Sequence, residues 1–128
     1  MLIQVWNKYA FLWRMINPKY LMFLLLSPQI QRYIHSEKVA MELFDFGVNA
    51  GVSSAVKCIQ RALNLIQFPV EIDCRMGPAT VQKINDASIN YEQSLYMGLI
   101  GFEFMHYYSI VHQDPKKLKF IRGWLARL

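Results

Sequence analysis

Residues 37–63 read EKVAMELFDFGVNAGVSSAVKCIQRAL and predict two helices that meet at a corner of small residues. Apolar residues recur at helical spacing on both sides of the corner, as Val39 and Leu43 do before it. Asn49 and Gly51 are residue types that tolerate left-handed backbone, so they favour a helix end and a sharp change of direction. We therefore expect helices near 37–48 and 53–66.

Polar residues are placed as helix caps would be. Ser36 is expected to cap the first helix, and Ser53 or Ser54 the second. Asp45 and Asn49 lie four residues apart, so both side chains should project from one face of the first helix near the corner.

Proline and glycine divide the rest of the chain into further helices. Gly77-Pro78 predicts one helix start, Asn90 the cap of a long helix that ends near His112, and Asp114-Pro115 the start of a final helix. Apolar and acidic residues alternate only briefly before Gly77, which predicts at most a minimal β-hairpin near 68–76. We expect an all-α fold, a compact domain of about six helices.

Two of these helices have a predicted inward face. The long helix is expected to bury Leu95, Leu99, Phe102, His106 and Ser109, and the final helix Leu118, Ile121, Leu125 and Leu128, with Phe120 and Trp124 flanking. Gly98 and Gly101 predict a close helix crossing, because glycine otherwise costs helix stability.

Residues 1–35 differ from residues 36–128, which we expect to form the main domain. They are apolar and predict helices near 2–16 and 19–27, but neither run reaches the roughly 20 apolar residues of a membrane span. The start of the chain shows no clear signal peptide. So much apolar surface predicts an interface through residues 1–26, either with a second copy or with a missing catalytic segment.

Composition, charge and cysteine content limit the kinds of protein that this chain can be. The chain has 128 residues and 54% hydrophobic content, which fits one folded domain and excludes disorder. Residues 115–128 hold five of its 14 basic residues and no acidic ones, so an anionic polymer is one candidate partner and a solvated helix face the alternative. Cys58 and Cys74 are expected to be free thiols, and no histidine, cysteine or carboxylate set has metal-ligand spacing.

Several motifs follow one another in an order that resembles a known family. They are LFDFGVNAG at 43–51, AVKCIQRALN at 55–64, IDCRMGPATV at 72–81, YY at 107–108 and FIRGWLAR at 120–127. Together they resemble the C-terminal, predicted peptidoglycan-binding region of the secretion-activator or phage-type N-acetylmuramidases, glycoside hydrolase family 108. The resemblance covers about residues 38–128 and implies the C-terminal half of a lysozyme-like fold.

The resemblance assigns family positions to individual residues. The matching positions are Phe44, Asp45, Val48, Asn49, Gly51, Gln60, Arg61, Leu63, Asn64, Asp73, Gly77, Pro78, Thr80, Gly123, Trp124 and Arg127. Cys74 departs from the family, which usually has glycine there, and would be strained if that position needs a positive φ. The E-G-G-Y segment that carries the family's general acid is absent from these residues.

Candidate chemistry centres on the first motif. Glycoside hydrolysis normally uses two carboxyls, and Asp45 is one candidate, with Asn49 placed to bind an amino-sugar substituent. Glu42 and Glu37 are possible substitutes for the acid, and Glu103 lies among apolar residues that could raise its pKa. The alternative is that Asp45 and Asn49 serve the helix end and turn.

The sequence therefore predicts a peptidoglycan-binding domain of a muramidase-like protein, bacterial or phage-encoded, acting at the cell wall or periplasm. Its substrate-binding residues would be Asp45, Asn49, Gln60 and Trp124, and its structural motif residues Gly51, Asp73, Gly77, Pro78, Thr80 and Gly123. No metal or other cofactor is indicated. The alternatives are an active muramidase that cleaves β-1,4 links, and a helical module that binds a protein partner or, less expected, nucleic acid through its basic C-terminal helix.

Overall fold

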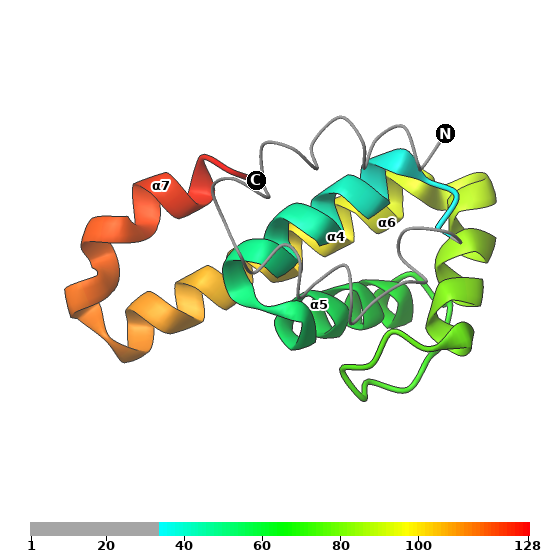
Figure 1. The fold of residues 1–128 in the computed structure, drawn as a ribbon, viewed down its shortest axis with the longest axis horizontal. Helices are drawn as coiled ribbons and strands as arrows, with labels where there is room; N and C mark the ends of the chain where they lie inside the picture. The colour runs from blue at the N-terminus through cyan, green and yellow to red at the C-terminus, as the bar shows by residue number, and fades with distance from the viewer. Residues whose placement is uncertain (1–33) are drawn as a thin grey trace.

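The computed structural model describes residues 34–128, and within them all regular structure is helical. The elements are α4 (Glu37–Ala50), α5 (Val52–Leu65), α6 (Pro78–Gln113), the 3₁₀ helix η1 (Pro115–Phe120) and α7 (Ile121–Leu125) (Figure 1). The predicted all-α class is confirmed. The helices expected near 2–16 and 19–27, and the interface expected through residues 1–26, lie outside the described residues. No helix within residues 34–128 is both long enough and apolar enough to cross a membrane.

The corner between α4 and α5 forms where it was predicted. Gly51 has a φ of 99°, which an L-residue with a side chain rarely adopts, and it separates the two helices. The Ser36 hydroxyl accepts a hydrogen bond of 3.2 Å from the Val39 amide, which confirms the expected cap. The expected cap at Ser53 or Ser54 is wrong, because α5 begins at Val52 with no side-chain cap bond.

α5 packs closely on α6 at one of the two predicted glycines. A Cβ atom added to Gly98 would lie 3.2 Å from the Cβ of Ala62, whereas one added to Gly101 would meet no atom of the described residues within 4 Å. Gly98 therefore marks the close crossing. Around it the buried core gathers apolar residues of α4, α5 and α6, among them Leu43, Phe46, Ile59, Leu63, Leu95 and Leu99.

The two helices predicted before and after Asn90 are one helix with a kink. Tyr91 has φ −131° and ψ 31°, so α6 changes direction there, and Figure 1 shows its two parts running at a clear angle. The predicted inward stripe is correct only at its start. Beyond Leu95 and Leu99 the buried residues are Glu103, Tyr107 and Val111, while Phe102 and His106 are half-buried and Ser109 is exposed.

This error has a geometric cause. Buried residues of α6 recur every four positions, which advances the buried face around the helix by about 40° per step because each residue turns 100°. The face turns because its partner changes along the helix, from α5 to η1 and α7. The prediction assumed one buried face along the whole helix, so it failed where the partner changes.

The C-terminal segment is not one helix. It forms η1 and then α7, and the chain turns back along α6 towards the α4–α5 corner (Figure 1). Ile121, Leu125 and Leu128 pack against the core as expected, but the prediction for Leu118 is wrong, since its side chain is 54% exposed. All six residues of η1 are exposed, so this segment meets the core only from Ile121 onward.

The loop between α5 and α6 contains no strand. Its course is set by two side chains of α5 instead. Asn64 makes hydrogen bonds to both the amide and the carbonyl of Val70, at 3.1 and 2.9 Å. Gln60 is fully buried and holds the later part of the loop. The alternating apolar and acidic pattern therefore belongs to an irregular loop fixed by side-chain amides.

Cys74 lies in that loop with a φ of 62°, the conformation in which a glycine would be unstrained. Replacing Cys74 with glycine should therefore raise the free energy of unfolding by roughly 0.5–1 kcal/mol, the cost of positive φ less the entropy of a glycine in the unfolded chain. Chemical denaturation of wild type, Cys74→Gly and Cys74→Ala measures it. The alanine variant keeps the Cβ atom and should match wild type; equal stability of all three would contradict the strain.

Candidate functional site

Two distant parts of the chain meet at the end of α4. The guanidinium of Arg127 donates a hydrogen bond of 2.7 Å from Nη1 to Oδ1 of Asn49, across 78 positions of sequence. The same Asn49 side chain donates from Nδ2 to the Asp45 carbonyl at 2.9 Å. Asn49 is therefore fixed in orientation, as a residue at a helix end often is, yet one hydrogen on Nδ2 stays unused.

Asp45 lies beside this pair. Its side chain is half-buried, and burial raises the pKa of its carboxyl above the ordinary value, while the nearby Arg127 charge acts in the opposite direction. Asp45 and Asn49 thus share one face at the corner, as the four-residue spacing predicted. Neither side chain is fully buried.

Aromatic rings join this corner to the C-terminal segment. Tyr107 of α6 packs edge-on against Phe46 of α4 with ring centroids 5.5 Å apart, and stacks on Trp124 of α7 at 5.3 Å with 21° between the ring planes. Trp124 is half-buried and stacks in turn on Phe120 at 5.8 Å. Burial, followed by the charge of Glu103, raises the pKa of Tyr107 to about 12, so its hydroxyl stays a hydrogen-bond donor.

The structure therefore brings together three of the four residues predicted to bind substrate. We call the surface formed by Asp45, Asn49, Trp124 and Arg127 the corner surface. It offers an acceptor, two donors and an apolar ring edge, which are the groups that bind sugar hydroxyls, N-acetyl groups and the C–H faces of sugar rings.

The fourth predicted residue, Gln60, lies away from the corner surface and contacts the loop between α5 and α6 instead. Its Nε2 lies 3.0 Å from Asp73 Oδ1, 3.1 Å from the Arg75 carbonyl and 3.0 Å from Thr80 Oγ1, and its Oε1 accepts from the Cys74 amide at 3.0 Å. No part of the side chain is exposed. Gln60 therefore holds the loop.

The motif residues of the loop surround Gln60. The hydrogen bond from Gln60, followed by that from the Arg75 amide, lowers the pKa of Asp73, whose side chain lies on the surface. Gly77 precedes α6 and Pro78 is its first residue, as the Gly-Pro pair predicted. A Cβ atom added to Gly123, in α7, would meet no atom of residues 34–128 within 4 Å.

A buried carboxyl lies behind the corner surface. Glu103 of α6 is fully buried, and neither of its carboxyl oxygens has a hydrogen-bond partner among residues 34–128. Burial raises its pKa far above the ordinary value, and the adjacent Glu42 of α4 raises it further, with a smaller contribution from Asp45. Burial also raises the pKa of Glu42, although Glu103 opposes this. Glu103 therefore keeps its proton at neutral pH.

The spacing of Glu103 in the sequence could have predicted its burial, although the predicted inward face of this helix did not include it. Glu103 lies four residues after Leu99 and four before Tyr107, on the buried face of α6. Within residues 34–128 no three histidine, cysteine or carboxylate side chains gather as a metal site would require. Cys58 is a buried free thiol whose pKa burial raises to about 12, and Cys74 is also free.

The structure also has a surface cleft that no pattern in the sequence predicted. An open cleft of about 490 Å³ lies between the residues that lead into α4 and the first turns of α6. It is lined by His35, Pro78, Val81, Gln82, Asn85, Asp86 and Ile89. It lies away from the corner surface, at the other end of α4.

Comparison with known proteins places the chain in a family. Residues 54–128, more than half of the chain, match the family model described as Predicted Peptidoglycan domain. The chain is thus a helical domain of the peptidoglycan-associated class, and it belongs to the Predicted Peptidoglycan domain family. The match covers α5, α6, η1 and α7, and so includes Trp124 and Arg127. No curated protein and no solved structure matches the chain.

Proposed function

We propose that the chain binds the glycan strands of peptidoglycan through the corner surface. Membership of the peptidoglycan domain family supports a peptidoglycan-binding role. The main observation in support of this binding site is the hydrogen bond between Arg127 and Asn49. It joins the first and last motifs of the sequence into one polar surface beside Trp124.

The contacts of these residues fit a ligand of neutral sugars. Asn49 and Arg127 each keep hydrogens that no group of residues 34–128 uses, and Asp45 can accept from a hydroxyl. Trp124 is held by stacking on Tyr107, so its orientation is set before a sugar arrives. A preorganised surface loses less entropy when it binds.

Cosedimentation with purified cell-wall sacculi tests this proposal. Asn49→Ala removes both the amide and the partner of Arg127, and should weaken binding roughly tenfold, the loss of one or two hydrogen bonds. Asn90→Ala, at an exposed asparagine near the kink of α6, is the matched control and should bind as wild type does. Equal binding by wild type and Asn49→Ala would overturn the site; no binding by any variant would overturn the function.

A second candidate function is hydrolysis of the same polymer. It is favoured by one observation, the raised pKa of Glu42 beside Asp45, since glycosidases pair a protonated carboxyl with an ionised one. Glu103 is fully enclosed, so in this case Glu42 would donate the proton and Glu103 would only tune its pKa. Clearing of a sacculus suspension that Glu42→Gln abolishes would establish hydrolysis; a stable suspension would leave binding alone.

A further inference from the structure

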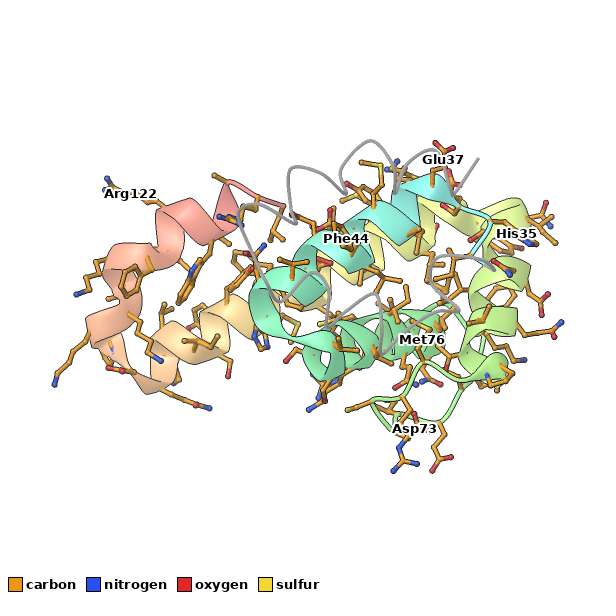
Figure 2. All side chains as sticks on the ribbon, in the orientation of Figure 1. His35, Glu37, Phe44, Asp73, Met76 and Arg122 are labelled. Carbon is orange, nitrogen blue, oxygen red and sulfur yellow. The ribbon has the colours of Figure 1, made fainter. Side chains whose placement is uncertain are left out.

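Four cations stand out on the C-terminal segment. Lys116, Lys117 and Lys119 of η1 and Arg122 of α7 are all exposed, and within residues 34–128 none of their side-chain cations pairs with a carboxylate. The Asp114 carboxylate accepts only from the backbone amide of Lys116, at 3.3 Å. Figure 2 shows the Arg122 side chain directed away from the body of the protein. The fifth basic residue, Arg127, differs because it is bound to Asn49.

The 3₁₀ geometry of η1 places two of these charges on one face. Residues three apart eclipse one another in a 3₁₀ helix and are separated by about 6 Å along its axis. Lys116 and Lys119 are such a pair, and Arg122 follows three positions later in the first turn of α7, about 60° further around the axis. We call these three residues the basic row.

The basic row is attached firmly to the corner surface. Phe120, next to Lys119, stacks on Trp124, which stacks on the buried Tyr107. The ammonium of Lys119 lies 5.1 Å from the centre of the Phe120 ring. A polymer bound at Trp124 would therefore meet the row at a defined position.

We propose that the basic row binds carboxylates of the peptide stems that branch from the glycan strand. This inference rests on the proposed function and adds a second, charged part of the same ligand to it. The argument is charge complementarity, because the row presents three side-chain cations without a carboxylate ion pair over about 10 Å, and residues 115–128 contain no acidic residue. A peptide stem is a short polyanion of comparable size.

The number of cations favours this ligand over nucleic acid. A protein that holds DNA by charge typically contacts about 6–10 phosphates, so it needs a longer basic surface than four side chains provide. Elsewhere the chain has as many acidic as basic residues in positions 1–114, nine of each. A few carboxylates on one stem match the row better than a long phosphate chain.

Sedimentation with chemically treated sacculi tests the inference separately from the proposed function. One sample of sacculi is left untreated, and in the other the stem carboxylates are converted to neutral amides. We expect wild-type protein to bind amidated sacculi roughly tenfold more weakly, as the loss of a few exposed ion pairs would give. Lys116→Glu/Lys119→Glu should bind untreated sacculi as weakly, and amidation should no longer weaken it.

The matched control is Lys57→Glu/Arg61→Glu, which makes the same change in charge at two exposed residues of α5. It should behave as wild type does, and Lys116→Gln/Lys119→Gln repeats the test without added negative charge. Wild-type binding that is equal for amidated and untreated sacculi would overturn the inference and leave the glycan site standing. The inference also fails if the row variants lose binding to DNA or anionic vesicles but not to untreated sacculi. Failure of every protein to bind sacculi would overturn both proposals.

Discussion

Replacing Glu103 with glutamine is expected to stabilise the protein at neutral and alkaline pH. The wild-type carboxyl is enclosed without a hydrogen-bond partner and next to Glu42, so its pKa in the folded protein is far above that in the unfolded chain. Folding therefore favours the protonated form, and this contribution is complete at low pH and is lost as the pH rises. The free energy of unfolding should fall by up to about 1.4 kcal/mol per pH unit.

The pH range from 7 to 9 isolates this effect. Burial lowers the pKa of His106, so that group changes its contribution only below its ordinary value of 6.5. Cys58 and Tyr107 begin to lower stability near their ordinary pKa values of 9.0 and 10.0, so only Cys58 contributes by pH 9, and it does so in both proteins. Within this range wild type should lose roughly 2–3 kcal/mol and Glu103→Gln much less, because the amide resembles a protonated carboxyl and can donate to Glu42.

Urea unfolding at pH 7, 8 and 9 measures the difference. Glu92→Gln, at an exposed position of the same helix, is the matched control and should follow wild type at each pH. A wild-type stability that is flat over these pH values, or a glutamine variant that loses as much as wild type, would show that Glu103 is not held as a neutral acid.

Replacing Gln60 with leucine is expected to cost about 2–4 kcal/mol of unfolding free energy. Leucine fills a similar volume, but the Cys74 amide and the Thr80 hydroxyl lose their partner inside the fold. The loop that leads into α6 would then keep the hydrogen bonds of Asn64 to Val70 but lose those that fix residues 73–75 and Thr80.

Thermal and urea unfolding provide the measurement for Gln60→Leu. Gln82→Leu, at an exposed glutamine of α6, is the matched control and should change stability by less than about 0.5 kcal/mol. Gln60→Glu sharpens the test, since it keeps the shape but adds a charge beside Asp73 and should be at least as costly as leucine. A Gln60→Leu protein as stable as wild type would show that the amide does not hold the loop.

Helix ends and small-residue positions were the most predictable part of the fold. Ser36, Gly51 and Pro78 act locally, through one hydrogen bond or one backbone angle, so their residue types alone indicate their roles. The kink at Tyr91 also follows a predicted boundary, although the chain continues as one helix.

Features that depend on the identity of a packing partner could not be predicted. The buried face of α6 turns as its partners change, so the predicted inward stripe left out Glu103 and included Ser109. Leu118 is exposed because η1 as a whole lies off the core, and the pattern of apolar residues did not show where contact with the core begins.

For the candidate site, the residue types were easier to predict than their grouping. The four-residue spacing of Asp45 and Asn49 placed both on one face of α4. The contact of Arg127 with Asn49 spans 78 positions of sequence, so it depends on how the whole chain folds. The same is true of Gln60, which is buried in the loop and does not lie at the corner surface.

Chemical-shift mapping of isotopically labelled protein with soluble glycan fragments of peptidoglycan tests the binding surface most directly. The account predicts saturable shifts of the Asn49 side-chain amide and the Trp124 indole N–H, together with the backbone amides around Gly51. Shifts confined to the open cleft near His35 and Asp86, or no shifts at saturating fragment, would contradict it.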